Sequence, residues 1–261
     1  MLKPNEFSDV QLGIGKISDF IQAKSGDDVN FEKDIKEKRR RKTWFLDTTR
    51  HSLNERNKFL LRVRKEDGTG KYDTTLKCRH PDRYLSASYD LWSPKENLQF
   101  KFEEDISTPF ISKFSFSASF EDSEMPDLSN FKDVKDIFPN LIVKDILETE
   151  SLSMVNNFEP SEMSYKIGTL EFSEKKSVNL DLNLWYLKED NNNTIPLIVE
   201  LTFNYESKKQ PEKNQTLLEE FSPSVVKKTN SFYHLLQDEE IADLLTTKTK
   251  TEFAYSYKKS R

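Results

Sequence analysis

The sequence predicts a β-dominated α+β protein: one eight-stranded antiparallel barrel with helices packed around it. Three observations support this fold class. Segments that alternate apolar and polar residues dominate the middle of the chain, and that period is typical of a half-buried strand. Helical spacing is confined to a few outlying segments. Aromatic residues make up 12% of the 261 positions, so a packed core of large rings is available although 33% of the residues are charged.

The alternating segments give the expected strands. The cluster Asp67–Gly70 lies between two of them and has the glycines typical of a hairpin turn. The strands are expected at Lys42–Asp47, Phe59–Lys65, Tyr72–Cys78, Leu98–Asp105, Lys113–Phe120, Met163–Phe172, Ser177–Leu187 and Pro196–Tyr205. We expect a single domain, with residues 1–41 as an N-terminal helix and basic linker and residues 42–261 as the barrel with a C-terminal helix.

Helices are expected at four places. Val10–Ala23 and Leu128–Phe138 carry apolar residues at helical spacing, and Asp127 or Ser129 is a candidate cap for the second. A short helix is expected at Val143–Glu148. A longer one is expected at Pro223–Thr247, with a break near Asp238.

Composition excludes several classes of protein. The net charge of −5 is unlike the basic footprint of nucleic-acid binders, so no nucleic-acid partner is expected. No apolar run has the length of a membrane span and no secretory signal is present, so no membrane partner is expected and a cytoplasmic location is predicted. The single cysteine, Cys78, cannot form an internal disulfide. The basic run Lys36–Lys42 is interpreted as a solvated loop, with an anion-attracting patch as the alternative.

The strands are informative because one face of each is polar. Arg62 and Arg64 share a face opposite Leu61 and Val63. The other expected polar faces carry Asp73, Thr75 and Lys77; Lys101, Glu103 and Asp105; Asn179, Asp181 and Asn183; and Ile198, Glu200 and Thr202. Periodicity leaves two placements open: these charges face solvent around an apolar centre, or helices cover the apolar faces and the charges line a wet interior.

The second placement has chemical consequences. Several cations beside carboxylates in a confined space are costly to leave without a ligand. Guanidinium groups bind phosphate oxygens in bidentate fashion, lysines act as point charges, and carboxylates suit Mg²⁺ or Mn²⁺. A polyphosphate chain held with a divalent cation fits this description.

These residues also resemble a known family. The stretch Lys42–Lys77 has an aromatic–Asp–Thr strand, an Arg-x-Arg strand, a turn and a strand ending in Thr-Leu-Lys. Leu197–Phe203 is similar to a late Val-Glu-x-Glu strand, and Pro223–Leu236 to a C-terminal segment with a lysine before an aromatic residue. Together they resemble the CYTH superfamily, the triphosphate tunnel metalloenzymes.

The resemblance implies an eight-stranded tunnel in which basic residues bind a triphosphate and glutamates hold Mg²⁺ or Mn²⁺. The expected catalytic residues are Arg62, Arg64 and Lys77, which also bind substrate. The further substrate-binding residues that it suggests are Lys101, Lys166, Lys227 and Lys228, and the metal ligands are Glu103, Asp181 and Glu200.

The chain departs from the family in its acidic residues. The family opens with Glu-x-Glu-x-Lys, but here the corresponding region is Phe7–Ile17, where Gln11 and Gly13 take the glutamate positions. Thr202 replaces the second glutamate of the late strand. The absence of these carboxylates is expected to weaken metal binding more than anion binding.

Four functions follow from these observations. The first is a triphosphatase, a metal-dependent phosphohydrolase that cleaves phosphoanhydride bonds. Its substrate would be inorganic triphosphate, thiamine triphosphate or a nucleoside triphosphate. The alternative is a polyphosphate-binding tunnel protein that has lost turnover. An adenylate cyclase belongs to the same superfamily, but no adenine pocket is indicated. A barrel with an apolar cavity requires Arg62 to point away from the interior.

Overall fold

The computed structural model describes residues 2, 4–25, 29–33, 35–107, 111–173, 176–187, 195–204, 223–236 and 249–258. The chain forms two compact units. Unit 1 is Met1–Arg39 with Glu162–Thr247, and unit 2 is Arg40–Ser161 with Lys248–Arg261. Each unit has its own apolar core.

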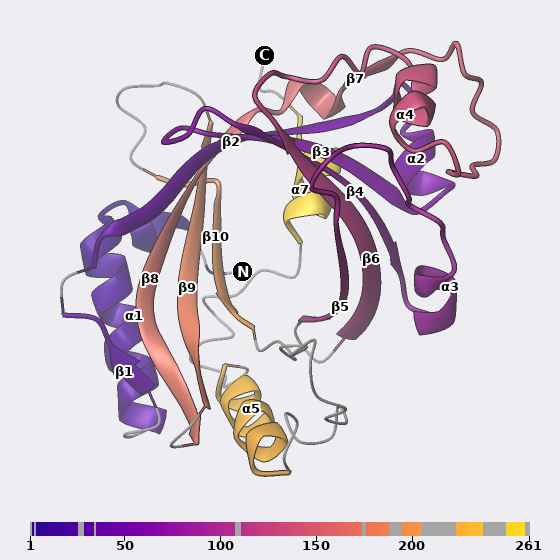
Figure 1. Ribbon diagram of the computed structural model, residues 1–261. Coiled ribbons are helices and arrows are strands. Elements are labelled where there is room, and N and C mark those ends of the chain that lie inside the picture. Colours follow the sequence, from indigo (N-terminus) through magenta and orange to yellow (C-terminus); the bar gives the residue numbers. More distant parts are fainter. Residues whose placement is uncertain are drawn as a thin grey trace. The chain divides into compact units, whose positions relative to one another are not determined.

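The described elements are mostly strands (Figure 1). The strands are β1 (Val29–Phe31), β2 (Glu37–Thr48), β3 (Phe59–Glu66), β4 (Tyr72–His80), β5 (Gln99–Ser107), β6 (Ile111–Asp122), β7 (Leu152–Met154), β8 (Pro160–Ser173), β9 (Lys176–Leu187) and β10 (Ile198–Phe203). The helices are η1 (Pro4–Phe7), α1 (Val10–Ser25), α2 (Ser52–Glu55), α3 (Arg83–Ala87), α4 (Phe131–Ile137), η3 (Val155–Asn157), α5 (Pro223–Leu235) and α7 (Lys250–Ser256).

Unit 1 places helices on the apolar face of its sheet. The strands follow the order β10-β9-β8, with β1 paired to β8, and the registered pairs are antiparallel. Leu180, Leu182 and Leu184 are fully buried and pack in one cluster with residues of α1 and α5, among them Ile14 and Phe232. Strand β9 alternates apolar and polar residues because the helices cover only one of its faces, on which every second side chain lies.

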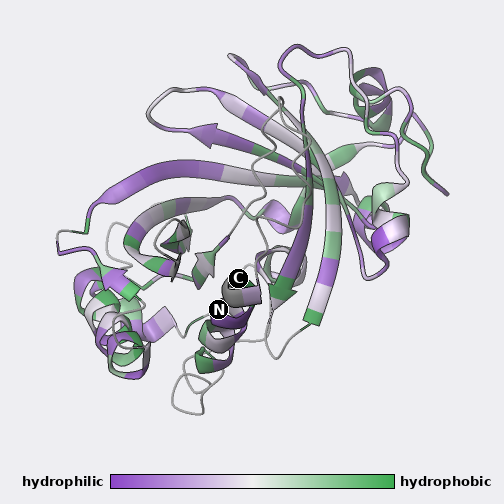
Figure 2. Ribbon diagram, turned by 60° about the horizontal axis from the view of Figure 1, so that its bottom comes forward, coloured by the Kyte–Doolittle hydropathy of each residue, from purple (hydrophilic) through white to green (hydrophobic). Residues whose placement is uncertain are grey.

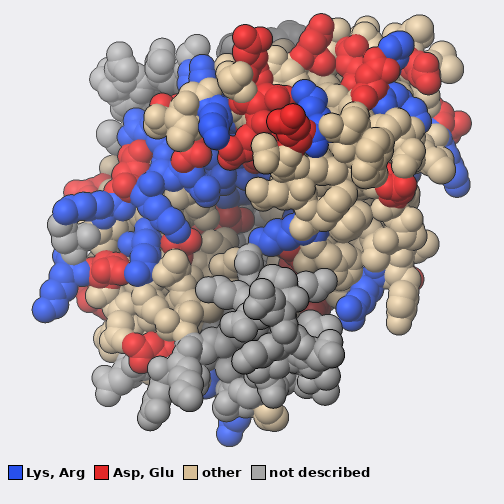
Figure 3. All heavy atoms as spheres, in the orientation of Figure 1, with Lys and Arg blue, Asp and Glu red and all other residues tan. Residues whose placement is uncertain are grey.

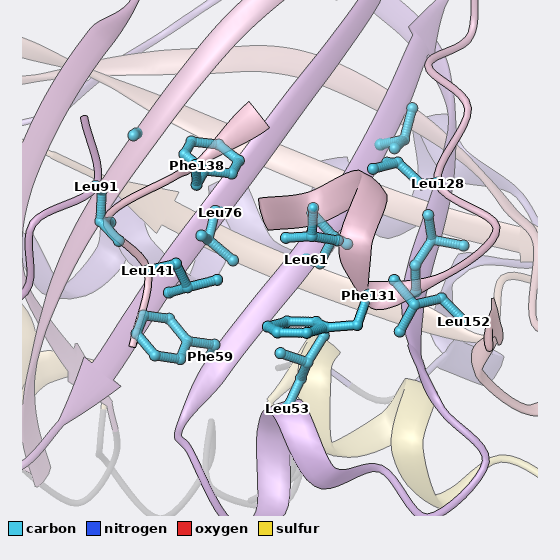
Figure 4. Packing of buried hydrophobic residues seen from close by; sticks show 14 of the residues in the cluster. Leu53, Phe59, Leu61, Leu76, Leu91, Leu128, Phe131, Phe138, Leu141 and Leu152 are labelled. Carbon is cyan, nitrogen blue, oxygen red and sulfur yellow. The ribbon is translucent and has the colours of Figure 1, made fainter. Parts of the chain in front are cut away.

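Unit 2 repeats this arrangement. From Arg40 onward its strands follow the order β2-β3-β4-β6-β5, all antiparallel, with β7 beside β2. Leu61 and Leu76 on the sheet pack with Leu53 of α2 and with Phe131 of α4 (Figure 4). Helix α4 begins at a capping box in which Asn130 and Asp133 satisfy each other's backbone N–H groups.

The alternation of faces is visible along the strands, where hydrophilic and hydrophobic residues follow one another (Figure 2). In β3, Leu61 and Val63 have no exposed surface, whereas Arg62 and Arg64 on the opposite face are half-buried. Helices cover the apolar face of the sheet in each unit, as the second placement expects. The wet interior lined by the charged faces stays a prediction. Cys78 is buried in the core cluster of unit 2, on the face opposite Lys77, as expected.

The prediction of an antiparallel, β-dominated fold is confirmed, and all eight expected strands are present. The finer prediction of eight strands closed into one barrel is not confirmed, because the described part of the chain has ten strands and their order does not close on itself. The two additional strands, β1 and β7, have three residues each and are too short to show a period. The predicted turn at Asp67–Gly70 joins β3 to β4, and Gly70 takes the positive φ of 70° that suits a glycine.

The helix predictions have mixed outcomes. Helix α1 is confirmed, and α4 is confirmed with Asn130 as its cap in place of Asp127 or Ser129. The helix expected at Val143–Glu148 is wrong. Helix α5 confirms the start at Pro223, and the expected break near Asp238 lies outside the described residues.

The basic run Lys36–Lys42 is not a loop. From Glu37 onward it forms the first half of β2, where Lys and Arg side chains gather on the surface (Figure 3). The end of the run pairs with β3, where Arg41 lies opposite Glu66 and Lys42 opposite Lys65. The high charge of the run suggested a loop and gave no sign that it would form a strand.

None of the described helices combines the length and the apolar character that a membrane crossing requires.

The expected division of the chain into an N-terminal segment, residues 1–41, and a barrel, residues 42–261, stays a prediction.

The core of unit 2 gives the first testable prediction. Leu61→Ala removes a fully buried side chain at the contact with α2 and α4, so we expect the free energy of unfolding to fall by about 2–5 kcal/mol. Urea denaturation measures the change. Leu147→Ala in the same unit is the control, since Leu147 is 73% exposed and its loss should change stability by less than about 0.5 kcal/mol. Equal effects of the two substitutions would contradict the assigned core.

Candidate functional site

The strongest concentration of functional side chains lies on the face of the unit 2 sheet that the core does not use. We call it the cationic face. It is defined by Arg62 and Arg64 of β3, Thr75, Lys77 and Arg79 of β4, Ser115 and Ser117 of β6, and Lys101, Glu103 and Asp105 of β5.

The hairpin β3–β4 positions the arginines. Because Leu61 and Val63 are held in the core, Arg62 and Arg64 must project to the other side of the strand. In the register of the hairpin, Arg62 lies opposite Thr75, and its Nη2 donates a hydrogen bond to Thr75 Oγ1 over 3.2 Å. Arg64 lies opposite Asp73. The hydroxyl of Thr75 thus orients one guanidinium group along the face.

Strand β6 leaves space for the long side chains on either side of it. Between Lys113 and Glu121 its residues on the cationic face are serines, with Ser117 opposite both Lys77 and Lys101, and Ser115 opposite both Arg79 and Glu103. On its other face, Phe116, Ala118 and Phe120 pack on or within the core. Small side chains on this strand allow the charges of β4 and β5 to meet across it.

The meeting point is the carboxylate of Glu103. Its Oε2 lies 3.0 Å from Lys77 Nζ, and its Oε1 lies 2.9 Å from Lys101 Nζ. Each carboxylate oxygen therefore faces one ammonium group. Lys77 is the more enclosed partner, with 13% of its side chain exposed against 29% for Glu103.

A second carboxylate continues this network toward the end of β4. Asp105 Oδ2 lies 2.8 Å from Arg79 Nη2 and 3.5 Å from Lys77 Nζ. Ser115 Oγ donates to the same oxygen over 3.4 Å. Lys77 is thus shared between Glu103 and Asp105.

The pKa values of this network follow from burial and charge. Burial by itself raises the pKa of Glu103, but the charge of Lys77 and the hydrogen bonds from Lys101 and Lys77 outweigh it and hold the pKa at about 2. Burial lowers the pKa of Lys77, and the nearby charges of Asp105 and Glu103 oppose this only in part. An ammonium group that burial disfavours gains from additional negative charge beside it.

Unit 1 carries a separate polar face on β9 and β10. Asp181 lies opposite Thr202, and Glu200 lies opposite Asn183, so the two carboxylates are diagonal neighbours on one face. Asp181 Oδ2 lies 3.3 Å from Lys38 Nζ. Asn183 accepts a hydrogen bond from Ser164 Oγ over 2.6 Å and donates to Thr202 Oγ1 over 3.3 Å.

The predicted lysines of unit 1 are less concentrated. Lys166 Nζ lies 2.7 Å from Glu32 Oε1, so its charge is matched by a residue next to β1. Lys227 is exposed on α5, and Lys228 Nζ donates to the backbone oxygen of Glu171 over 3.4 Å.

The structure thus divides the predicted site residues between the units. It brings Arg62, Arg64, Lys77, Lys101 and Glu103 together on the cationic face of unit 2. The other predicted residues, Lys166, Asp181, Glu200, Lys227 and Lys228, belong to unit 1.

The predicted metal ligands fit a divalent cation unequally. Both oxygens of Glu103 face ammonium groups, so this carboxylate does not fit the role of a metal ligand in the arrangement observed. Asp181 and Glu200 carry carboxylate oxygens, which Mg²⁺ and Mn²⁺ prefer, on neighbouring strands, although Asp181 Oδ2 also lies 3.3 Å from Lys38 Nζ. In the part of the chain that is described, no three His, Cys, Asp or Glu side chains gather as a metal site requires.

Sequence reasoning missed three contributors to the cationic face: Arg79, Ser115 and Ser117. The expected strand ended at Cys78, one residue before Arg79, although the spacing Lys77-x-Arg79 continues the period-two pattern. The alternation of phenylalanine and serine from Phe114 to Ser117 also indicates a strand with one small polar face. These two signals were sufficient to find all three residues.

No protein-family model and no curated protein matches the chain. A solved structure from Hippeastrum, described as a candidate adenylyl cyclase with a dominant triphosphatase activity, is similar over 94% of this chain and 90% of its own, at 13% sequence identity and a TM-score of 0.45. Membership of the triphosphate tunnel metalloenzymes stays a prediction from the sequence.

The depressed pKa of Glu103 predicts a specific pH dependence. The folded protein binds a proton at Glu103 more weakly than the unfolded chain, whose pKa is near 4.5, so this contribution to stability is fully present above about pH 4.5 and is lost as the pH falls toward about 2. We therefore expect the free energy of unfolding to fall more steeply over this range in the wild type than in Glu103→Gln.

Urea denaturation at several pH values measures these slopes. Glu104→Gln is the matched control, because Glu104 is adjacent in β5 but lies on the opposite face, next to Ser112. It should keep the slope of the wild type. The ion-pair network is wrong if Glu103→Gln also keeps that slope.

Proposed function

We propose that the protein acts on a triphosphate or a short polyphosphate, whose oxygens bind to the cationic face of unit 2. The observation that supports this is the gathering of cationic side chains from three strands on one partly buried face, with serine and threonine hydroxyls between them. These cations are Arg62, Arg64, Lys77, Arg79 and Lys101. A chain of phosphates carries regularly spaced negative oxygens and matches such a row better than a single carboxylate does.

The first candidate activity is hydrolysis of a phosphoanhydride bond. In phosphoryl transfer, catalysis depends mainly on positioning and on stabilising the negative charge of the transferred group. Arg62 and Arg64 would bind non-bridging oxygens in bidentate fashion, and Lys77 would supply a point charge at the developing negative charge. Thr75 would keep Arg62 oriented before substrate arrives.

The substrates that we propose are inorganic triphosphate, thiamine triphosphate and nucleoside triphosphates, with Mg²⁺ or Mn²⁺ as cofactor. Such a cation, bound to the phosphate chain, would neutralise part of its charge. Asp181 and Glu200 of unit 1 are the predicted ligands with carboxylates on a common face. No catalytic step is assigned to the metal.

The second candidate function is binding without turnover. It is favoured by the engagement of Glu103 with two lysines and by the absence of an acidic triplet at Phe7–Ile17. The face would then recognise a phosphate polymer by charge alone. In this case affinity should persist when divalent cations are chelated, and it should fall with salt.

Arg62→Ala tests the shared claim of both candidates. Loss of one charge-assisted interaction of about 1.5–3 kcal/mol should weaken tripolyphosphate binding about ten- to one-hundred-fold. Isothermal titration calorimetry at fixed ionic strength measures the affinity. Lys65→Ala is the matched control, because Lys65 follows Arg64 directly but lies over the ring of Tyr72 on the other face of the sheet.

A phosphate-release assay with Mg²⁺ or Mn²⁺ then separates the two candidates. Release of phosphate from tripolyphosphate or a nucleoside triphosphate, lost in Arg62→Ala and kept in Lys65→Ala, supports the hydrolase. Binding without release supports the binder. If calorimetry detects no binding of any polyphosphate to the wild type, both candidates are wrong.

A further inference from the structure

The apolar face of the unit 2 sheet continues past its covering helices onto β5. All nine residues of β5 are described, and none of them belongs to the core cluster of the unit. Three of its side chains on this face are nevertheless large and apolar. They are Phe100, Phe102 and Ile106, which are 52%, 39% and 40% exposed. Among the described strands β5 is the last in the order, next to β6, so the apolar face ends here without a cover (Figure 1).

Two rings of β6 join this exposed surface to the core. The ring of Phe100 stacks on that of Phe116 with 5.8 Å between centroids, and the ring of Phe102 stacks on that of Phe114 with 6.3 Å. Each pair is diagonal in the ladder, where aromatic side chains still reach each other. We call Phe100, Phe102, Ile106, Phe114 and Phe116 the aromatic strip. A contiguous apolar surface of this kind marks a site of interaction, whereas single exposed apolar residues do not.

One base and one acid accompany the strip. Arg83 begins α3, and its Cζ lies 5.7 Å from the centroid of the Phe102 ring. Helix α3 is held against β6, because Ser86 Oγ donates a hydrogen bond to the backbone oxygen of Phe114 over 2.8 Å. Glu104 follows Phe102 by two residues and therefore shares its face. Both charged side chains are exposed, and within the described part of the chain neither forms an ion pair.

This arrangement of rings and charges is complementary to a second copy of itself. In an interface with two-fold symmetry both molecules use the same surface. An axis that passes between Phe102 and Glu104 packs the rings of one copy on those of the other, and it brings Arg83 of each copy to Glu104 of the other. The apolar centre then loses its contact with water, and both charges are matched. A strip that carried charge of one sign only would repel its own copy.

We propose that the aromatic strip is a self-association surface through which two molecules of this protein pair. The strip is formed by one strand and part of its neighbour, which is small for an interface, so we expect a weak dimer with a dissociation constant on the order of 10–100 μM. Protein diluted well below that concentration, as for urea denaturation, is then monomeric. The strip lies on the face opposite Lys101 and Glu103, so the pairing does not use the cationic side chains and does not depend on the proposed function.

Sedimentation velocity of the full-length protein, from well below to well above that dissociation constant, measures the association. Phe102→Ser removes the central ring, which is outside the core. Ile142→Ser is the matched control, since Ile142 is 79% exposed in the same unit but belongs to the segment after α4. Arg83→Glu brings like charges together, and Arg83→Glu combined with Glu104→Arg restores opposite charges in exchanged positions. Circular dichroism and thermal unfolding of each dilute variant report whether it folds.

We expect the wild type to dimerise with increasing concentration and Ile142→Ser to match it. Phe102→Ser and Arg83→Glu should each weaken the dimer by about ten-fold or more, and the charge exchange should recover most of the loss of Arg83→Glu. The charge exchange keeps every ring, so it decides the question even if Phe102→Ser does not fold.

The proposal is overturned if the wild type stays monomeric at the highest concentration, if folded Phe102→Ser dimerises like the wild type, or if the charge exchange recovers nothing. It is also overturned if the monomeric wild type binds phosphatidylcholine vesicles and folded Phe102→Ser does not, because the strip would then be a membrane-binding surface.

Discussion

The feature on which the rest of the structure depends is the separation of apolar and charged side chains onto opposite faces of the same strands. In β3, Leu61 and Val63 have no exposed surface because α2 and α4 complete the core on their side. That burial fixes the orientation of the strand and obliges Arg62 and Arg64 to share the other face. A register shift of one residue would bring the guanidinium groups into the core, at a cost of several kcal/mol for each unpaired charge. The helices that cover the sheet thus determine where the cations can be.

The cations of the cationic face do not only repel one another, because carboxylates lie between them. Glu103 lies between Lys77 and Lys101, and Asp105 lies between Lys77 and Arg79. This alternation stabilises the face in the absence of a ligand. It also means that a phosphate chain must compete with resident carboxylates, which favours ligands of high charge over single anions. Lys77, enclosed and shared between two carboxylates, is the centre of this arrangement.

Much of the fold could be predicted from local sequence, because its strands have one buried face. Leu-Arg-Val-Arg in β3 and Leu-Asp-Leu-Asn in β9 show the alternation directly, and the division of each segment between two opposite faces was correct. The failures have tertiary causes. Val143–Glu148 has apolar residues at helical spacing, but Asn57 binds both backbone groups of Lys144, and Asp145 adopts a positive φ. These contacts span 87 positions in sequence and leave no local signal.

The candidate site was predictable to a similar degree. The cations of β3, β4 and β5 follow from strand periodicity and from the family resemblance, whereas their pairing depends on which strands are neighbours. Strand β6 lies between β4 and β5, an order that reverses the sequence order of β5 and β6. That order puts Ser117 between Lys77 and Lys101 and brings Glu103 within reach of both lysines. The hydrogen bond from Tyr255 of α7 to Asp47 was hidden for the same reason, since the two residues are 208 positions apart.

The most direct test of the account is the reactivity of individual lysines toward an amine-specific reagent, measured by mass spectrometry with and without tripolyphosphate. If the cationic face of unit 2 binds the phosphate chain, Lys77 and Lys101 should become protected, while Lys65 on the opposite face and Lys71 in the hairpin turn keep their reactivity. Protection that is equal at all four lysines, or that is confined to Lys65 and Lys71, would contradict the account.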